Sequence, residues 1–196
     1  MRLPGYIKLT LNLNFAYNVI MRSLILPLLL SLVLLSHSQE REFGTPERVL
    51  STLYPSASVE VRNIILTKEQ KEKVEKLAKV RIESRLVSFY FVKEGDRVVA
   101  YGYVDTHRVR THTESVLFVI SPQGSIELVE VLAFNEPLEY MAEENWLALF
   151  KGKTLPRDTL RLRRDIPNIT GATLTARAIT KAARRAVALW KVLFGG

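Results

Sequence analysis

The stretch from Leu174 to Phe194 most constrains the fold of this chain, because it reads as one long helix with two different faces. Basic residues occupy one side, at Arg177, Lys181, Arg184 and Lys191. The apolar residues recur at helical spacing on the other side: Leu174, Ala178, Ala182, Ala183, Ala186, Val187, Trp190 and Phe194. Several of them are small, so the helix can pack closely on a sheet. The basic face is either solvated or rests against acidic headgroups.

The sheet is predicted by strand signals that occur in pairs. Residues 86–92 and 98–104 flank one turn, and residues 116–120 and 126–133 flank another. A further strand is expected at residues 59–66, and alternation in the last strand is too irregular to show which face is buried. No Gly-rich dinucleotide fingerprint or βαβ alternation is present. The sequence therefore predicts an α+β domain: an antiparallel sheet built from hairpins, with flanking helices and a long C-terminal helix.

Two shorter helices are predicted upstream of the hairpins. Thr45 is a suitable cap for a helix that begins at Pro46, since proline is favoured at the first helical position. Residues 67–70 (Thr-Lys-Glu-Gln) form a capping box for a second helix over residues 68–79. That second helix is highly charged, and its Lys and Glu residues are expected to be a solvated face.

The first 38 residues resemble a secretory signal behind an upstream extension. Met21-Arg22-Ser23 precedes an apolar run of about a dozen residues, and small residues follow up to Ser38. We expect Met21 to be the true start, cleavage after Ser38, and a domain over residues 39–196. An uncleaved anchor is the alternative, although the run is shorter than the ~20 residues of a membrane span. The expected location is the periplasm or the outer face of the cytoplasmic membrane.

Composition and charge narrow the function. The chain is 47% hydrophobic and 24% charged, as in globular proteins, and its net charge of +8 falls to +5 without residues 1–38. This moderate basicity suits an anionic ligand or an anionic membrane surface, but does not indicate nucleic acid. The chain has no cysteine, which excludes disulfides, thiolate-bound iron–sulfur clusters and thioether-linked haem. If the protein transfers electrons, an organic cofactor must do so.

The loop that leads into the final helix offers a candidate phosphate site. A helix N-terminus leaves backbone N–H groups unpaired and has partial positive charge, so it favours phosphate. A glycine there lets a ligand approach the backbone, and a threonine hydroxyl can be esterified to the phosphate. The alternative is that Thr170 or Thr173 simply caps the helix. The candidate residues are Thr170, Gly171, Ala172, Thr173, Leu174 and Thr175.

Residues 170–175 resemble the Ser/Thr-Gly-Ala-Thr-x-Ser/Thr motif of the FMN-binding domain family. That family includes the C subunit of the sodium-translocating NADH:quinone reductase and the G subunit of the Rnf complex. The resemblance implies that FMN is the cofactor and that a flavin transferase attaches it through its phosphate to Thr173. The family usually has Asp three residues before the first hydroxyl residue. This chain has Pro167 there, with Asp165 two positions earlier.

Two further stretches resemble the same family. Residues 129–140 read as a strand ending in a glutamate-containing turn, which in relatives lies beside the flavin and here implies Glu136, without the usual glycine after it. Residues 146–153 are similar to a helix end followed by Phe-x-Gly-Lys in membrane-associated regulatory and dehalogenation-linked members. If Tyr140 or Trp146 reaches the site, it can cover one face of the isoalloxazine ring. Alternatively, Trp146 is an ordinary core residue and Gly152 an ordinary helix terminator.

Other candidates point less directly to a site. His107 and His112 lie in a stretch (106–113) that lacks further metal ligands at suitable spacing, so we expect a surface loop and no metal site. A basic segment between residues 155 and 164 either helps to hold the phosphate or coats a surface strand. Its arginines are Arg157, Arg161, Arg163 and Arg164.

Two hypotheses of function follow. In the first, the chain is an exported FMN flavoprotein that relays one or two electrons at the cell envelope. Its partners are then a flavin transferase and the redox proteins of a membrane electron-transfer chain, and no general base or nucleophile for another reaction is evident. In the second, the chain is a flavin-free basic module that binds anionic lipid or an envelope polymer.

Overall fold

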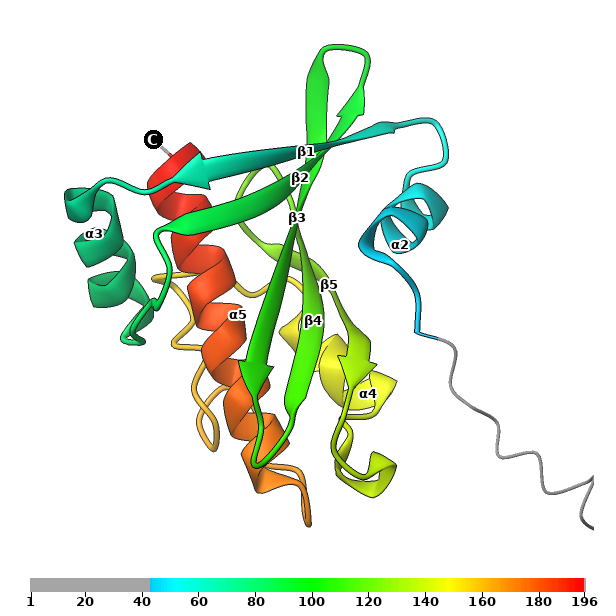
Figure 1. The fold of residues 1–196 in the computed structure, drawn as a ribbon, viewed down its shortest axis with the longest axis vertical. Coiled ribbons are helices and arrows are strands. Elements are labelled where there is room, and N and C mark those ends of the chain that lie inside the picture. Colours follow the sequence, from blue (N-terminus) through cyan, green and yellow to red (C-terminus); the bar gives the residue numbers. More distant parts are fainter. Residues whose placement is uncertain (1–42, 196) are drawn as a thin grey trace, which may run out of the picture. The chain divides into compact units, whose positions relative to one another are not determined.

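The computed structural model describes residues 43–195, and the expected signal segment and domain start lie outside them (Figure 1). The described residues form one antiparallel five-stranded sheet in the order β1-β2-β3-β4-β5. The strands are β1 (Ser58–Ile65), β2 (Leu86–Glu94), β3 (Arg97–Arg108), β4 (Thr113–Ile120) and β5 (Ile126–Phe134). The helices are α2 (Pro46–Leu53), α3 (Lys68–Ala78), α4 (Glu144–Leu147) and α5 (Thr173–Phe194), with 3-10 turns η1 (Leu138–Tyr140) and η2 (Ala148–Phe150). The predicted α+β class, with hairpins and a long C-terminal helix, is confirmed.

The two predicted N-terminal helices begin where their caps place them. Thr45 accepts a hydrogen bond from the backbone N–H of Arg48 (3.3 Å) and caps α2, with Pro46 in the first turn. At α3 both bonds of the capping box are present, between Thr67 and Gln70. Local chemistry alone therefore sets these helix starts.

The main core lies between one face of the sheet and α5, which packs on β3, β4 and α3 (Figure 1). The alanines at positions 182, 183 and 186 are fully buried there, opposite Phe89 and Phe118 of the sheet. Because an alanine projects only a methyl group, the helix axis can approach the large sheet residues closely. Burial of this face supplies most of the apolar area that stabilises the fold.

A smaller core covers the opposite face of the sheet. Leu50 of α2 packs against Val92, Leu117 and Val119, all of them fully buried. Since β4 is covered on both faces, every residue from Val116 to Ile120 is buried. This explains why that strand reads as a continuous apolar run in the sequence.

The irregular alternation of β5 results from two shifts in its pairing with β4. Ile120 pairs with Ile126 and Val119 with Leu128, so Glu127 is an extra residue on β5. A second shift, between Ser115 and Val116, makes residue 132 extra. Each bulge inverts the in–out pattern beyond it, so the side chains that face the main core are not spaced in simple twos. The core-facing residues are Ile126, Val129, Val131 and Phe134.

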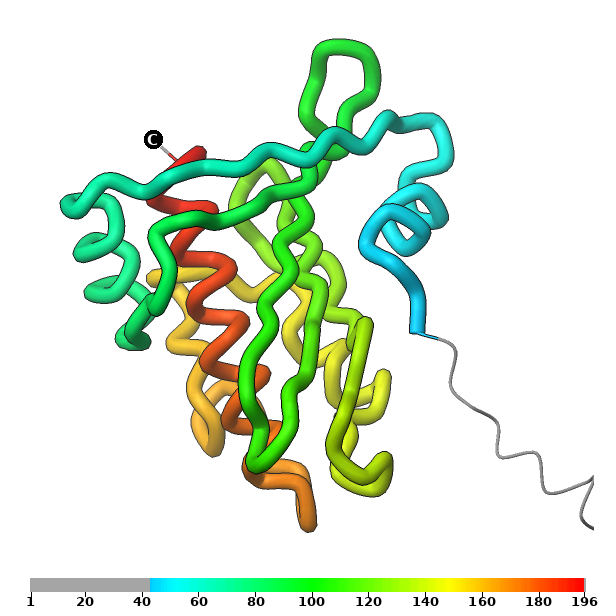
Figure 2. The backbone as a smooth tube through the Cα atoms, viewed as in Figure 1, coloured from blue at the N-terminus to red at the C-terminus, as the bar shows by residue number. Residues whose placement is uncertain are grey.

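Some sequence predictions are wrong in detail. The expected loop over residues 106–113 is shorter than predicted: β3 continues to Arg108 and β4 begins at Thr113, so only residues 109–112 form the turn. Residues 155–164 form no surface strand; only one isolated bridge joins Leu162 to Ile166. This segment instead runs beside α5 and then turns into its start (Figure 2). Leu174, assigned to the apolar face of the last helix, is 43% exposed.

None of the helices between residues 43 and 195 combines the length and apolar character that a bilayer crossing needs.

Gly124 provides a test of the contact between the β4–β5 turn and α5. Its φ is +83°, and a Cβ added there would lie 2.2 Å from Cζ3 of Trp190. We expect Gly124→Ala to lower the free energy of unfolding by about 3 kcal/mol, because the left-handed backbone and the overpacked ring both oppose a side chain. Urea unfolding of the chain measures this change.

Gly95→Ala is the matched control, since Gly95 also has a positive φ (+61°) but open space around it. We expect only the backbone cost there, about 1 kcal/mol. Equal losses for the two variants would contradict the packing argument.

Candidate functional site

The N-terminus of α5 is left without a cap. Its N-cap residue is Ala172, which offers no side-chain acceptor, and neither Thr170 nor Thr173 caps the helix. Within residues 43–195, the N–H groups of Thr173, Leu174 and Thr175 have no hydrogen-bond acceptor. Because α5 has 22 residues, its dipole adds partial positive charge at the same place. The structure therefore presents three free donors at a positive helix end, which is the arrangement that binds phosphate.

The loop in front of this helix end is open to a ligand. Gly171 has a φ of +81°, and a Cβ added to it would meet no atom within 4 Å. Thr173 is half-buried, and its Oγ1 accepts a hydrogen bond from Nδ2 of Asn168 (2.9 Å). This bond orients the hydroxyl and leaves its proton unshared. Asn168 was not among the residues predicted to form the site; its place just before the Thr-Gly-Ala-Thr run is the only sequence signal for it.

A cavity of about 260 Å³ lies beside this loop. At this cavity the start of α5 meets three segments that lie more than thirty positions earlier in the sequence. They are the turn between β3 and β4, the chain just after β5, and the η1 turn. Thr175, which is buried, donates a hydrogen bond to the Tyr140 carbonyl (2.7 Å) and so ties η1 to α5. The lining residues are Val109, Arg110, Glu136, Tyr140, Gly171, Ala172, Thr173, Leu174 and Thr175.

Glu136 closes one wall of this cavity through backbone contacts. Its carboxylate accepts N–H bonds from Arg110 (3.0 Å), Thr111 (2.6 Å) and His112 (2.8 Å). These bonds, first among them the one from His112, lower the pKa of Glu136 to about 2. The side chain is therefore ionised at neutral pH, and it holds the β3–β4 turn against the cavity instead of exchanging protons.

Trp146 lies beneath the site and lines neither it nor the larger cavity described below. Its ring packs edge-to-face against Phe150, with centroids 5.3 Å apart, and its Nε1 donates to the Pro167 carbonyl (2.9 Å). This places Trp146 in the core, where it fixes the start of the 168–172 loop. Thr170 is exposed and outside the cavity lining, as are the four arginines of the 155–164 segment.

Comparison with known families indicates what kind of ligand this part of the chain binds. Residues 112–188 match the model of the FMN-binding domain family. The match shows an FMN-binding domain over this part of the chain. The matched segment runs from the start of β4 into α5 and contains both Glu136 and the Thr170–Thr175 loop, and FMN is the cofactor. No curated protein matches the chain. Of the two hypotheses drawn from the sequence, the match favours the flavoprotein over the flavin-free module.

The residues of the FMN site fit such a ligand in two respects. The free N–H groups of α5 suit the phosphate, and Oδ1 of Asn168, which is buried without a hydrogen-bond partner, is an acceptor for a hydroxyl or N–H group of the ligand and not for its phosphate. The cavity of about 260 Å³ is smaller than a usual small-molecule pocket of ~300 Å³ or more, so it would hold only part of an FMN molecule. Tyr140, with 38% of its surface exposed, lies at that boundary.

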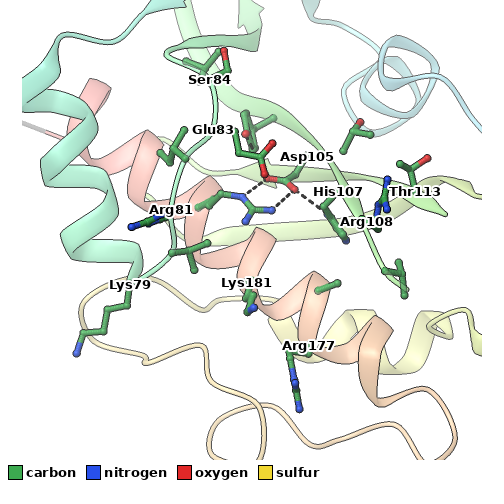
Figure 3. A pocket seen from close by; sticks show the side chains of 18 of the residues that line it. Lys79, Arg81, Glu83, Ser84, Asp105, His107, Arg108, Thr113, Arg177 and Lys181 are labelled. Carbon is green, nitrogen blue, oxygen red and sulfur yellow. Dashed lines mark hydrogen bonds and ion pairs between the residues drawn. The ribbon is translucent and has the colours of Figure 1, made fainter. Parts of the chain in front are cut away.

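A larger cavity of about 970 Å³ adjoins the FMN site and shares Val109 and Leu174 with it. Its inner wall contains ion pairs that link β3 to α5 (Figure 3). Arg185 donates two hydrogen bonds to Asp105, at 2.6 and 2.8 Å. His107 lies between two carboxylates, with Nδ1 2.9 Å from Asp105 and Nε2 3.1 Å from Glu114. His107 therefore belongs to an ionic cluster, not to the surface loop that the sequence predicts.

Burial opposes the charged forms of the residues in this cluster, whereas ion pairing favours them. Burial opposes the charge on Asp105, but the bonds from Arg185 and His107 outweigh it and lower the pKa of Asp105 to about 2. Burial also opposes the charge on His107, but its bonds to Asp105 and Glu114 raise the pKa of the ring to about 8. Burial raises the pKa of Glu114, whose Oε1 has no partner. Among the described residues, no group of His, Asp and Glu is arranged to hold a metal ion.

The role of Glu136 as a turn clamp predicts acid sensitivity. Its pKa is about 2 in the folded chain and ~4.3 in an unfolded one. Its contribution to stability is therefore complete above pH ~4.3 and is lost as the pH falls toward 2. We expect Glu136→Gln to lower the melting temperature clearly at pH 6 and less at pH 3. Thermal unfolding between pH 3 and pH 6 measures the change in melting temperature, with the exposed neighbour Glu139→Gln as control. A decrease in melting temperature that does not depend on pH would contradict the role of the ionised Glu136 in holding the turn.

The paired His107 predicts the opposite pH dependence. Its pKa is about 8 when folded and ~6.5 when unfolded, so its contribution is complete below pH ~6.5 and is lost as the pH rises through 8. We expect His107→Gln to lower the free energy of unfolding by about 2 kcal/mol more at pH 6 than at pH 9. Urea unfolding at both values tests this, and equal losses would show that the ring is not charged when folded.

Proposed function

We propose that this chain is an exported flavoprotein that carries FMN on Thr173 through a phosphoester and relays one or two electrons at the cell envelope. The observation that supports it most is the uncapped N-terminus of α5, which opens on a cavity beside a half-buried threonine hydroxyl. A helix end without a cap leaves its N–H groups available to water or to an acceptor of a ligand. A phosphate ester on the first helical residue supplies that acceptor.

The flavin then lies along the cavity. Its phosphate accepts from the N–H groups of Thr173, Leu174 and Thr175, while Gly171 keeps the approach open. The ring extends toward Glu136 and Tyr140, and the exposed Tyr140 side chain is available to cover one of its faces. Arg110 lines the same cavity and adds positive charge near the cofactor.

Attachment requires an activated flavin donor. The hydroxyl of Thr173 loses its proton as its oxygen bonds to phosphorus, and a leaving group on that phosphorus departs with the bonding electrons. FMN by itself offers only a hydroxyl as leaving group, so the donor is a flavin dinucleotide and a nucleoside monophosphate leaves. A flavin transferase supplies the catalysis. Asn168 is a positioning residue, because its Nδ2 bond orients the oxygen that attacks.

The bound flavin supplies the electron chemistry, and the protein positions the ring and tunes its surroundings. The proposed partners are redox proteins of a membrane electron-transfer chain. The proposed location, in the periplasm or on the outer face of the cytoplasmic membrane, is based on the signal-like pattern of residues 1–38. A covalent tether is useful there, because FMN lost outside the cytoplasm is not readily replaced.

Intact-mass measurement tests the attachment. The chain is co-expressed with a flavin transferase, purified from the envelope and denatured before the measurement. We expect the wild type to carry the mass of one FMN phosphoester and Thr173→Ala to carry none. The matched control is Thr170→Ala, which removes a hydroxyl that is exposed and outside the cavity and should keep the added mass.

Two outcomes would contradict the proposal in different parts. A wild-type protein that is yellow when folded but loses its flavin on denaturation would disprove the phosphoester and leave flavin binding intact. Retention of the added mass in Thr173→Ala, together with its loss in Thr170→Ala, would move the linkage to the other hydroxyl.

A further inference from the structure

The larger cavity beside the FMN site is surrounded by cations from three segments. Lys79 and Arg81 come from the chain after α3, Arg108 from the end of β3, and Arg177 and Lys181 from α5 (Figure 3). Over residues 43–195, none of these five side chains has an ion-pair or hydrogen-bond partner. The cavity therefore gathers positive charge that the described protein does not neutralise.

The acidic residues of the cavity do not balance this charge. Only Glu83 and Asp105 line it, and Asp105 is already bonded to Arg185 and His107. Arg185 balances Asp105, and His107 lies against Glu114, so the five unpaired cations face only Glu83. A concave surface with one sign of charge concentrates oppositely charged ligands. Such a cavity favours an anion with more than one negative group.

The walls between the cations are apolar. Leu86 is 56% exposed and Leu174 is 43% exposed, and both line the cavity together with the partly buried Val80 and Val109. Large apolar side chains that remain exposed within a concave site favour a ligand with an apolar body. The volume of about 970 Å³ is at the upper end for small-molecule pockets.

From these features we propose that the larger cavity binds a small organic dianion, with an aromatic or aliphatic body, next to the flavin and separately from the FMN phosphate. The body packs on Leu86 and Leu174, and the acidic groups pair with the cations of the loop and of α5. A small molecule fits better than a membrane surface, because the cations line a cavity of about 970 Å³ that has apolar side chains between them. Only the position next to a flavin depends on the function proposed above.

Anthraquinone-2,6-disulfonate is a suitable probe, since it joins a flat apolar body to two permanent negative charges. Its binding to the full chain is measured by titration calorimetry, with and without FMN. We expect one molecule to bind to each form. Raising the salt from low to high concentration should weaken binding about tenfold or more, because the contacts are charged and open to solvent. Menadione, an uncharged quinone, should bind at least tenfold more weakly.

Charge reversal locates the site. Lys181→Glu should weaken binding of the disulfonate at least tenfold, because it replaces a wall cation by an anion. Lys73→Glu is the matched control: it makes the same change in net charge at an exposed helix position outside the cavity, and binding should stay within twofold of the wild type. Unchanged melting temperatures confirm that both variants are folded.

Several results would overturn the proposal. One is that the disulfonate binds to neither form, and another is that the two charge reversals have equal effects on its binding. A third is that only a poly-glutamate peptide binds, which would indicate an acidic protein partner. Loss of binding when FMN is loaded would show that the flavin itself fills this cavity. None of these results bears on the attachment at Thr173, which the mass measurement decides independently.

Discussion

The close packing of α5 on the sheet determines where the proposed cofactor site lies. Fully buried alanines at positions 182, 183 and 186 let the helix approach the aromatic residues of the sheet, and this contact fixes its direction. The helix start is therefore held beside the β3–β4 turn, with its N–H groups facing a cavity and not the core. Any change that tilts α5 would move the site, even if every residue of the loop stayed the same.

Two polar contacts join the separate segments at this helix start. The Glu136 carboxylate gathers three N–H groups of the β3–β4 turn, and Thr175 bonds the Tyr140 carbonyl of η1. Both side chains are buried, so each bond forms where water cannot compete well. Loops that would otherwise be mobile are thereby made into walls. The ligand meets a preformed surface, which reduces the entropy lost on binding.

Much of the fold could be predicted because its signals are local: the capping box at Thr67, the hairpin turns and the helical periodicity of the last segment. The Thr-Gly-Ala-Thr loop could be recognised in the sequence as a candidate site because its chemistry is also local; that it binds the cofactor stays a prediction. The ionic role of His107 could not, since Asp105 and Glu114 reach it only after β3 and β4 pair. The bulges of β5 and the contact of Asn168 with Thr173 likewise depend on three-dimensional packing.

Val109 and Leu174 border both cavities, and this thin apolar partition has an electrostatic consequence. Apolar side chains screen charge poorly, so a charge on one side changes the free energy of a charge on the other. If both cavities are filled as proposed, a bound dianion makes the flavin harder to reduce. By thermodynamic reciprocity, adding electrons to the flavin must then drive the dianion toward release by the same factor.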